Sequence, residues 1–493
     1  MPIPSNLEQD LDLLVQKGME AWNIPGLAVT IVKDDQLVLS KGYGLRDINK
    51  PDPVDEDTLF AIASNTKAFT AAAIGLLVQD GKLAWDDPVT EYLPWFRLHD
   101  EHATQLITIR DLLCHRSGLG TWAGDILQLS DFTTEEVIRR VRHIPPAYPF
   151  RAGYGYSNLM FITAGLVLTA VSGLSWDQFI QQRLFEPMGI TNSVTNARFF
   201  DGRTNIAEPH EEIEGEVRVV SRREDAGFGA AGSILASARE IALWLRLHLN
   251  NGCLDGKQII DESIITEMKT PQTVMPIQPF ERKLFPSRHF AAYGLGWFLN
   301  DHHGRMIVRH TGGLDGMLSS TLMVPEENLG IAIFTDKLPN FVYLALTYHL
   351  VDRFLGIDSQ DWLKDYLDYG ADIKGQADEA RQKLHAGRVT GTHHSLPLKE
   401  FAGTYESLTA GGAAVRVGGH KLHLQLEAHE TLSGELTHWH YDSFMCKWDD
   451  PVLGESLVPF ITDGQGHVTE FKVKIREDWI DPLEHIFVKC PSR

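Results

Sequence analysis

A serine and a lysine three residues apart, Ser64 and Lys67, stand directly before a strongly apolar stretch over residues 68–78. On a helix, residues three apart lie on one face, about a turn from each other. A serine hydroxyl becomes an effective nucleophile when a neighbouring base takes its proton, and a lysine in a dry pocket can be that base once its pKa is depressed. The pair therefore predicts a nucleophilic serine at a helix start, where free N–H groups favour developing negative charge. A helix-capping serine followed by a solvated lysine is the alternative that this spacing leaves open.

A second motif, Tyr156-Ser157-Asn158, follows a turn-rich stretch and carries two groups that such a serine needs. A tyrosine whose phenolate is stabilised by a nearby ammonium can act as a base and later protonate a leaving group. The asparagine can hold the lysine through its amide oxygen and a substrate through its NH₂ group. A loop tyrosine followed by a helix-capping residue is the simpler interpretation of these residues alone.

A third motif, His310-Thr311-Gly312-Gly313, ends an expected strand over 305–310. Consecutive glycines at a strand end allow a substrate to approach the sheet edge closely. A main-chain N–H group there can complete an oxyanion hole together with the N–H group of Ser64. An ordinary turn after the strand is the alternative.

The elements expected around these motifs indicate an α+β fold, in which helices pack on an antiparallel sheet. Their order follows from apolar periodicity and turn residues. They are a helix over 7–22, hairpin strands over 27–32 and 37–44, a mostly helical region from about 64 to 250, strands over 305–310, 319–324 and 329–334, and a helix from about 340 to 354.

The last third of the chain has a different pattern. Residues 358–386 are polar and helix-prone and end before Gly387. From Leu396 the pattern predicts short strands separated by turns, over 401–407, 413–419, 421–427, 443–448, 457–463 and 468–475. Closely spaced short strands are typical of a small antiparallel barrel or sandwich. We therefore predict a catalytic domain over 1–355, a helical and polar linker over 356–395, and a small antiparallel β-barrel over 396–493.

Composition excludes several classes of partner. The 493 residues include 45 Lys and Arg against 66 Asp and Glu, a formal net charge of −21. A chain this acidic is a poor ligand for nucleic acid and for anionic lipid.

The most apolar run, over 159–174, is interrupted and too short for a membrane span. The N-terminal residues carry acids where a secretory signal carries basic residues, so we expect a cytoplasmic protein without a membrane partner.

Several patterns that resemble cofactor or metal sites are rejected. The Gly-rich match over 227–232 follows a polar stretch where a nucleotide-binding loop would follow a strand. The His-Asp-Glu-His run over 99–102 lacks further ligands, and the pairs over 302–303 and 393–394 are interpreted in the same way, as solvated side chains. The four cysteines contain no CxxC pair and are expected to be reduced thiols. No metal and no cofactor are expected.

The order of the three motifs resembles that of serine β-lactamases and penicillin-binding proteins, above all their class C-like branch of esterases, D-amino-acid peptidases and β-lactamase-related proteins. The resemblance covers about residues 10–355, and residues 396–493 look like the lipocalin-like barrel appended in some relatives. Further segments that are similar to that branch lie at 81–89, 112–119, 186–189, 231–233 and 293–297.

This resemblance implies a β-lactamase/transpeptidase-like fold with a helical subdomain and a serine hydrolase that acts through an acyl-enzyme. The implied substrate is a small ester, amide or peptide. The implied roles are Ser64 as nucleophile, Lys67 and Tyr156 as the proton-transfer pair, Asn158, His310 and Thr311 as substrate-positioning residues, and the N–H groups of Ser64 and Gly313 as the oxyanion hole.

The chain departs from the family pattern in its third motif, which usually begins with a lysine that helps to bind a substrate carboxylate. An imidazole titrates near pH ~6.5, so His310 is mostly uncharged at neutral pH and would hold a carboxylate weakly. This favours small esters, amides or D-amino-acid peptides over β-lactams. Arg116 stands where the family more often has a small residue, and could restore positive charge or block a subsite.

Two other functions stay open at this point. One is a β-lactamase proper, and the other is a scaffold or self-assembling protein with little catalysis, in which the barrel is the interaction module. The presence of Ser64, Lys67 and Tyr156 together counts against a scaffold, which has no physical need for all three. Whether the chain forms a homo-oligomer cannot be decided from residue types.

Overall fold

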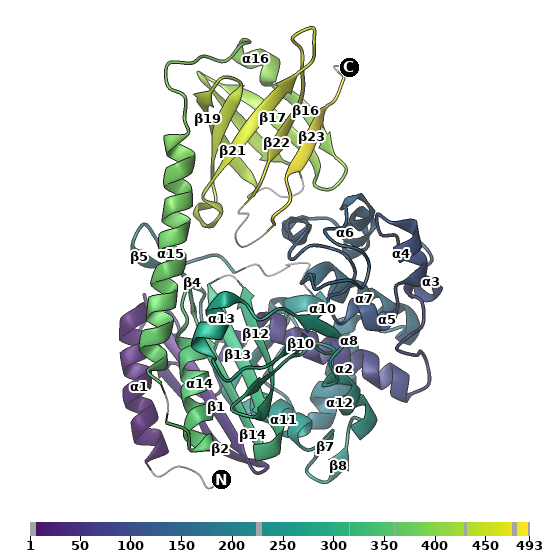
Figure 1. Ribbon diagram of the computed structural model, residues 1–493, viewed down its shortest axis with the longest axis vertical. Helices are drawn as coiled ribbons and strands as arrows, with labels where there is room; N and C mark the ends of the chain where they lie inside the picture. The colour runs from purple at the N-terminus through teal and green to yellow at the C-terminus, as the bar shows by residue number, and fades with distance from the viewer. Residues whose placement is uncertain are drawn as a thin grey trace. The chain divides into compact units, whose positions relative to one another are not determined.

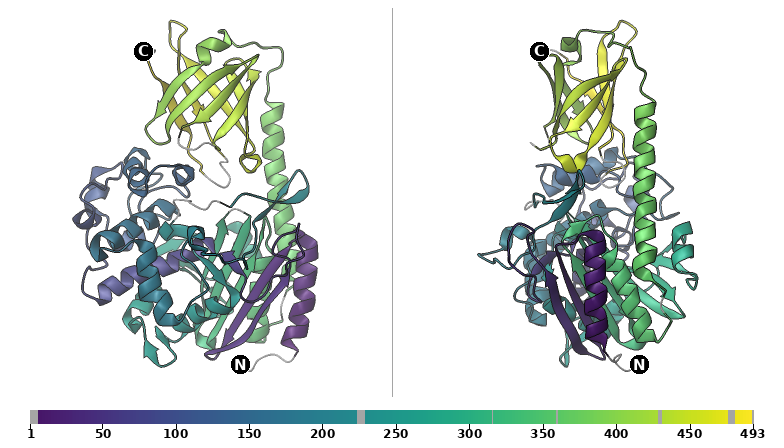
Figure 2. Two further views of the ribbon diagram at one scale, coloured as in Figure 1. Left: turned by 180° about the vertical axis from the view of Figure 1, so that it is seen from behind. Right: turned by 90° about the vertical axis from the view of Figure 1, so that its left-hand side faces the viewer.

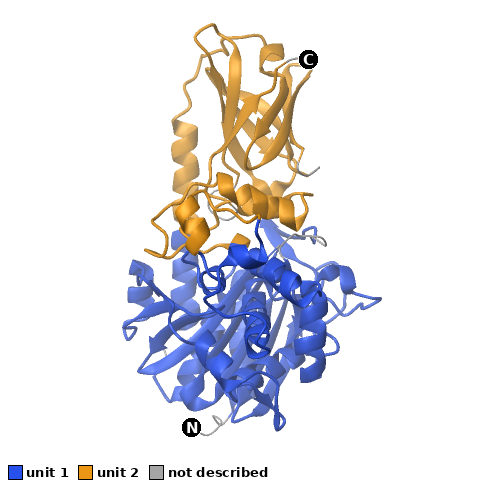
Figure 3. Ribbon diagram, turned by 90° about the vertical axis from the view of Figure 1, so that its right-hand side faces the viewer, with its two compact units in different colours: residues 1–94, 107–116, 160–373 blue, residues 95–106, 117–159, 374–493 orange. Residues whose placement is uncertain are grey.

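The chain forms two compact units, which Figure 3 shows in two colours. The computed structural model describes residues 6–222, 229–314, 316–358, 360–427, 431–475 and 481–491. Unit 1 comprises Met1–Pro94, Ile107–Arg116 and Met160–Ile373, and unit 2 comprises Trp95–Leu106, Ser117–Leu159 and Lys374–Arg493. Two segments from the middle of the chain thus group with the C-terminal residues. The domain boundaries at 355 and 396 stay a prediction.

Unit 1 is built on an eight-stranded antiparallel sheet. Its strands are β1 (Gly26–Lys33), β2 (Gln36–Gly44), β9 (Thr273–Met275), β10 (Ala291–Tyr293), β11 (Phe298–His302), β12 (Arg305–Leu314), β13 (Met317–Val324) and β14 (Leu329–Thr335). They lie in the order β2-β1-β14-β13-β12-β11-β10-β9, so the N-terminal hairpin pairs with a strand from the far end of the unit (Figure 1). The predicted antiparallel sheet is confirmed. The strands β9, β10 and β11 were missed, because they are short or, like β11, mostly polar at one end.

The hairpin between β1 and β2 turns where it was predicted. Its central residues, Asp34 and Asp35, have φ values of 51° and 64°. Two consecutive positive φ values define the turn type whose twist matches that of the flanking strands, and Asp tolerates this region better than most residues.

Helices cover both faces of the sheet. They include α1 (Leu7–Trp22), α11 (Ala238–Leu249) and α14 (Val342–Leu355). The side chains of Leu27, Val29 and Ile31 pack in one core with α1 and α14, which lie side by side (Figure 2). Alternate residues of a strand face opposite sides, and Thr30 accordingly donates its hydroxyl to the backbone oxygen of Ala238 at the start of α11. The strands β1 and β14 are therefore buried on both faces, whereas the edge strand β2 is partly exposed.

Shorter elements complete unit 1. The helices are α2 (Thr66–Gln79), α3 (Val89–Tyr92), α5 (Ile109–Leu112), α8 (Trp176–Ile180), α9 (Glu186–Met188), α10 (Gly229–Gly232), α12 (Glu262–Met268) and α13 (Pro279–Leu284). The small sheets pair β3 (Leu59–Ala61) with β6 (Leu235–Ser237), β4 (His210–Ile213) with β5 (Glu216–Val219) and β15 (Lys337–Leu338), and β7 (Cys253–Leu254) with β8 (Lys257–Gln258). The region expected to be mostly helical thus also contains β4, β5 and β6. The rejected Gly-rich match over 227–232 lies partly outside the described residues, and its remainder forms α10.

Two helices continue from one unit into the other. They are α7 (Asn158–Ser172), whose first two residues belong to unit 2, and α15 (Trp362–Ala386). Within the described residues, none of the helices is by itself long and apolar enough for a membrane span. One pair, α7 with Trp176–Met188, meets that test jointly but bends by 75°.

Unit 2 contains a closed antiparallel barrel, as predicted. Its strands are β16 (Gly403–Ser407), β17 (Gly411–Gly418), β18 (Lys421–Leu426), β19 (Ser433–His440), β20 (Ser443–Trp448), β21 (Glu455–Thr462), β22 (Val468–Val473) and β23 (His485–Lys489). Each strand pairs with the next one in sequence, and β23 closes on β16. The strands β19 and β23 were missed, since β19 carries polar residues on both faces. The helices are α4 (Glu101–Leu106), α6 (Thr134–Arg140) and α16 (Leu398–Phe401).

His302 corrects one expectation about the polar surface. It was interpreted as a solvated residue, but its side chain is buried on β11 and its Nε2 lies 2.7 Å from Asp352 Oδ1. The other oxygen of Asp352 accepts a hydrogen bond of 2.7 Å from Trp362 Nε1. The residue type alone did not reveal this, because the strand that buries His302 was itself missed.

A second buried histidine, His248 on α11, gives a stability prediction. Its ring lies 4.2 Å from that of Trp244 and 5.2 Å from that of Trp297, and neither ring nitrogen has a hydrogen-bond partner among the described residues. Burial lowers the pKa of His248 well below its usual value, with a smaller contribution from the charge of Lys269. Below pH ~6.5 the unfolded chain therefore binds a proton at His248 that the folded chain does not bind. As far as this group is concerned, the free energy of unfolding is highest above pH ~6.5 and falls as the pH drops below that value.

We expect the variant His248→Phe to melt at a higher temperature than the wild type, because an unpaired buried polar ring is destabilising. The stability of the variant should also fall less steeply below pH ~6.5, by up to about 1.4 kcal/mol per pH unit. Calorimetric melts between pH 5 and 8 measure both effects. The exposed His102, changed to phenylalanine, is the control and should leave the slope unchanged. An unaltered slope in His248→Phe would contradict the prediction.

Candidate active site

Ser64 lies in a short turn between a strand and a helix. The 3₁₀ turn η1 (Ala63–Asn65) follows β3 and leads directly into α2. Ala63 has a φ of 46°, a left-handed conformation that is strained for a residue with a side chain and that often occurs at functional sites. Ser64 is partly exposed, whereas Ala63 and Asn65 are buried. The helix-capping alternative does not hold, because the residue that caps α2 is Asn65, which makes no side-chain capping bond.

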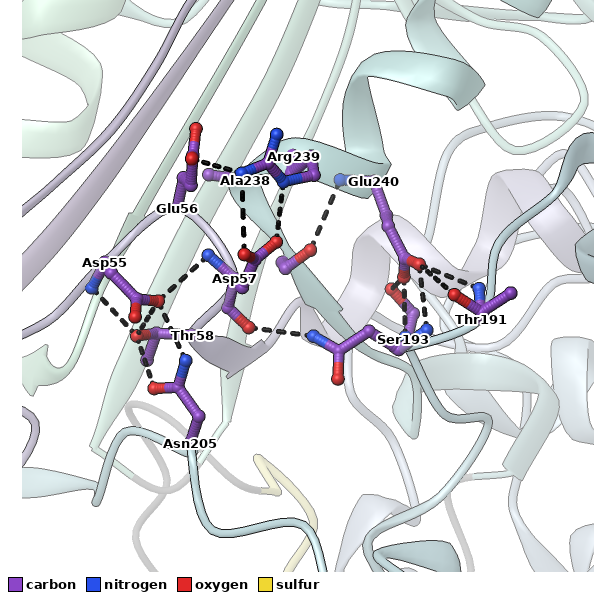
Figure 4. Close-up of polar contacts among 12 residues, drawn as sticks. Asp55, Glu56, Asp57, Thr58, Thr191, Ser193, Asn205, Ala238, Arg239 and Glu240 are labelled. Atoms are coloured by element: carbon purple, nitrogen blue, oxygen red, sulfur yellow. Dashed lines mark hydrogen bonds and ion pairs between the residues drawn. The ribbon is translucent and has the colours of Figure 1, made fainter.

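A polar network anchors the strand that leads to this turn (Figure 4). Arg239, at the start of α11, pairs with Asp57 at 2.7 Å and also with Glu56, just before β3. The neighbouring Glu240 is buried and accepts a hydrogen bond of 2.6 Å from the backbone N–H of Ser193. The Arg239 pairs thus link the residues just before β3 to the start of α11.

Asn65 anchors the other side of the turn to the sheet. Its Nδ2 donates to Ser319 Oγ at 2.8 Å, and its Oδ1 accepts from Thr321 Oγ1 at 2.5 Å. Ser319 Oγ in turn donates to the backbone oxygen of Ile62 at 2.7 Å. All of these groups are buried, and satisfied buried networks hold a single arrangement rigidly.

Lys67 stands in the first turn of α2 and has no exposed surface, which excludes the solvated-lysine alternative. Its Nζ donates to Ser64 Oγ at 2.9 Å and to the backbone oxygen of Ala231, on α10, at 2.7 Å. The ring of Phe161 lies 5.5 Å from the same nitrogen. The structure therefore brings the predicted nucleophile and the predicted base into hydrogen-bond contact, with the base fully buried.

The glycines of the third motif let β12 pass directly against the Ser64 turn. A Cβ atom at Gly312 would lie 2.2 Å from the backbone oxygen of Ile62 and 3.0 Å from Ala63 Cβ. The pairing of β12 with β11 ends at Arg309, so that residues 310–314 pair with β13 on one side and extend beyond β11 on the other. Backbone groups next to Gly312, including that of Gly313, thus lie at an open strand edge near the turn.

His310 lies on β12, two residues before Gly312. Its Nε2 lies 2.9 Å from the hydroxyl of Tyr293 and its Nδ1 lies 2.6 Å from the backbone oxygen of Thr311. Burial and then the charge of Lys67 lower the pKa of His310 well below its usual value, so the ring is neutral at pH 7. A role for His310 or Thr311 in holding a substrate stays a prediction.

Two aromatic neighbours of His310, His115 and Tyr293, lie in family-like segments of the sequence but received no role from it. The ring of His115 lies 4.5 Å from that of Tyr293 and 5.2 Å from that of Phe161. Burial, followed by the charges of Lys67 and His310, lowers the pKa of His115. A single histidine or tyrosine carries no spacing signal, so only the fold reveals that these rings surround the lysine.

Arg116 does not supply free positive charge. Its Nε donates to the fully buried Asp111 at 2.5 Å, and its Nη1 donates to the backbone oxygen of Gln272 at 3.2 Å. The carboxylate therefore compensates the guanidinium charge. A restored positive charge, the first of the two roles considered for Arg116, is therefore not supported, and blocking of a subsite stays a prediction.

The second motif belongs to unit 2. The backbone N–H of Tyr156 donates to Thr121 Oγ1 at 3.1 Å, and its backbone oxygen accepts from the N–H of Trp122 at 2.8 Å. Asn158 begins α7, and its Nδ2 donates to Asp125 Oδ2 at 2.6 Å. The catalytic role of Tyr156 and the positioning role of Asn158 stay predictions.

Among the residues that the structure describes, no three His, Cys, Asp or Glu side chains are grouped so as to hold a metal ion. All four cysteines are free thiols, and Cys114 and Cys446 are buried.

The contact at Gly312 predicts that the variant Gly312→Ala is impaired. The added methyl group would overlap the Ile62 oxygen, so either β12 or the Ser64 turn must move. Overpacking of this kind destabilises a protein by about 1–3 kcal/mol, and a shift of about 1 Å in a reacting group can lower turnover about a hundredfold. Ester hydrolysis and thermal melting check both effects. Gly375→Ala on α15, which has open space around it, is the control, and equal behaviour of the two variants would contradict the prediction.

Comparison with known proteins gives matches over both halves of the chain. The family model described as Beta-lactamase matches residues 11–353, and the model described as Domain of unknown function (DUF3471) matches residues 387–484. The octameric penicillin-binding protein homologue from Pyrococcus abyssi superposes with a TM-score of 0.63 at 21% identity, covering 98% of this chain and 100% of that chain. At this identity the likeness concerns the fold.

Curated relatives include hydrolases. Unguisins hydrolase ungD' of Aspergillus campestris (strain IBT 28561) is 30% identical over 429 residues, which cover 81% of this chain and 76% of the relative. Protein flp of Staphylococcus aureus (strain COL) is 27% identical over 355 residues, which cover 69% of this chain and 65% of the relative. The matched family model includes the Ser64 turn, the Lys67 contact and the glycine-lined strand within its span. The chain belongs to the beta-lactamase family, whose members are generally serine hydrolases.

Proposed function

We propose that this protein hydrolyses ester or amide bonds of small molecules through an acyl-enzyme on Ser64, without a metal or cofactor. Small esters and D-amino-acid peptides are the proposed substrates. The observation that carries the proposal is the fully buried Lys67 ammonium, which donates to the hydroxyl of a partly exposed serine at 2.9 Å. A base and a nucleophile within hydrogen-bond distance, on a rigid turn beside an open strand edge, are what nucleophilic catalysis by serine requires.

The proposed acylation step begins when Lys67, in its neutral form, accepts the proton of Ser64. The oxygen attacks the carbonyl carbon of the substrate, and the N–H groups of Ser64 and Gly313 stabilise the negative charge that develops on the carbonyl oxygen. The close packing of Gly312 against Ile62 supports this role for Gly313, because it holds the next backbone group of β12 near the turn. The Lys67–Tyr156 pair then protonates the leaving group.

Chain connectivity supports the participation of Tyr156 and Asn158. Phe161, whose ring lies 5.5 Å from Lys67 Nζ, is on α7 only three residues after Asn158. A helix rises about 1.5 Å per residue, so this separation amounts to about 4.5 Å along α7. A water molecule activated by the same pair would then hydrolyse the acyl-enzyme and release the acid.

The charges around the site support a preference for substrates that carry no carboxylate group where the substrate would meet the third motif. His310 is neutral because burial lowers its pKa, and Asp111 compensates the charge of Arg116. An anionic group of a β-lactam would find little positive charge there from these two residues. The relative from Aspergillus campestris is named a hydrolase, which agrees with the proposed reaction class.

A substrate panel tests the proposal. We expect turnover of p-nitrophenyl acetate or butyrate, or of D-alanine p-nitroanilide, with a kcat/KM at least about a hundredfold above that for nitrocefin, a gap of about 3 kcal/mol. The L-alanine anilide reports the stereochemical preference. Absence of turnover across the panel would contradict the proposed function, and preferred hydrolysis of nitrocefin would favour a β-lactamase proper.

Self-association is also proposed, because the structural neighbour from Pyrococcus abyssi is described as octameric. Light scattering on the active preparation measures the mass of the particle. A monomer that is fully active would contradict this part of the proposal and leave the chemistry unaffected.

A further inference from the structure

The segment over 121–126 holds the Tyr156–Asn158 motif in place. Thr121 and Trp122 bind the backbone of Tyr156 on both sides, at 3.1 and 2.8 Å. Asp125 accepts from Asn158 Nδ2 at 2.6 Å. A carboxylate accepts only, so the NH₂ group of Asn158 must face Asp125 and its amide oxygen must face away. The segment therefore sets both the place of the tyrosine and the orientation of the asparagine amide.

This segment adopts a conformation that needs support. Trp122 has a φ of 61° and Gly124 a φ of 81°, and a Cβ at Gly124 would lie 2.4 Å from Ile144 Cδ1. The 3₁₀ turn η2 (Asp125–Leu129) begins here, and its capping residue Gly124 has no side chain to accept the first free N–H groups. Such a turn is stable when another part of the protein supplies the acceptor.

The acceptor is Asp481, in the connection between β22 and β23 of the barrel. Its Oδ1 accepts from the N–H of Gly124 at 3.2 Å and its Oδ2 accepts from the N–H of Ile126 at 3.4 Å. These two N–H groups flank Asp125, the residue that binds Asn158. One carboxylate from the C-terminal barrel thus accepts hydrogen bonds on both sides of Asp125, the residue that orients the Asn158 amide.

Residues of the barrel and of its connections also bind Asp481. It has no exposed surface, and it also accepts from the N–H of Leu483 at 2.9 Å. His485, the first residue of β23, places its Nε2 3.2 Å from Asp481 Oδ2, and its Nδ1 lies 3.1 Å from Thr409 Oγ1. A buried carboxylate needs several donors to be stable, and these barrel residues supply them while fixing the direction of the carboxylate.

We propose that Asp481 is a positioning residue for the reaction, through which the barrel orients the Asn158 amide by way of Asp125 and its neighbours Gly124 and Ile126. The inference rests on the proposed function of the Tyr156–Asn158 motif. Asp481 touches neither substrate nor the reacting atoms. It acts by capping the turn that carries Asp125, so its loss should lower kcat more than it changes KM.

The experiment compares Asp481→Ala in the full-length protein with the matched variant Asp463→Ala. Asp463 is also a barrel aspartate that accepts from backbone N–H groups, those of Gln465 and His467, but within its own exposed turn. We expect Asp481→Ala to lower kcat for a p-nitrophenyl ester about 10- to 100-fold with a small change in KM. Asp463→Ala should keep the wild-type kcat. The variant Asp481→Asn retains one acceptor oxygen and should therefore have a kcat between those of Asp481→Ala and the wild type. If Asp481→Ala does not fold, the kcat of Asp481→Asn decides the question.

A double-mutant cycle with Asn158→Ala separates positioning from a general effect on the fold. If Asp481 acts through the asparagine, Asp481→Ala should lower kcat by less than about threefold once Asn158 is already alanine. The same loss in both backgrounds, or no loss in either, overturns the role of Asp481. Wild-type activity of Asn158→Ala by itself would instead overturn the proposed function of the motif, so the two failures are distinguishable.

Discussion

Replacing Ser64 by alanine is expected to lower kcat/KM for p-nitrophenyl esters by about 10⁵-fold or more. The reason is that the variant lacks the hydroxyl that accepts from Lys67 Nζ at 2.9 Å and that is proposed to attack the substrate. The buried contacts of Asn65 and Thr321 hold the turn independently of the serine oxygen, so the variant should fold normally. Ester turnover and circular dichroism measure the two properties.

A matched control distinguishes catalysis from helix capping. Ser175 also stands at the start of a helix, where its Oγ accepts from the N–H of Gln178 at 3.2 Å. Ser175→Ala removes a cap worth about 1 kcal/mol and should leave turnover unchanged. A loss of less than tenfold in Ser64→Ala would show that hydrolysis occurs elsewhere in the molecule.

The second large effect is expected for Lys67→Met. Methionine has a similar length and fills the same apolar space, but it cannot take a proton. Loss of a general base lowers turnover about 10²- to 10⁴-fold, and we expect the upper end of that range, because Lys67 touches the nucleophile directly. The variant should melt no lower than the wild type, since a buried ammonium is expensive to desolvate.

The exposed Lys82, just beyond the end of α2, provides the control for Lys67→Met. Lys82→Met removes an equal charge near the same helix and should not change kcat. If Lys67→Met retained kcat within a factor of five while Ser64→Ala was inactive, another residue would have to serve as the base, and the proposed division of roles would fail.

Local patterns in the sequence were enough to predict the elements that are determined by residues close together in the chain. The helix over 7–22 and the Asp34–Asp35 turn depend on spacing and turn chemistry alone. The pair Ser64 and Lys67 was recognisable for the same reason, since a helix start fixes the relation between residues three apart. The six predicted barrel strands also show regular alternation over most of their length.

The remaining features depend on contacts between distant parts of the chain. His310 meets Tyr293, and Tyr293 meets His115, only because β10, β12 and the residues that follow α5 converge. The burial of His302 follows from a strand too polar to predict. Asp481 lies more than 350 positions from Gly124, and neither residue type indicates that they bind. The helical segments that group with the barrel in unit 2 likewise reflect packing between distant segments.

The most direct test of the account is to locate the covalent adduct. The protein is treated with a fluorophosphonate, digested, and sequenced by tandem mass spectrometry, with Ser64→Ala in parallel. The account predicts one phosphonyl group per chain on the peptide that contains Ser64 and Lys67, and none in the variant. An adduct on another residue, or an enzyme that turns over esters while Ser64 stays unmodified, would contradict it.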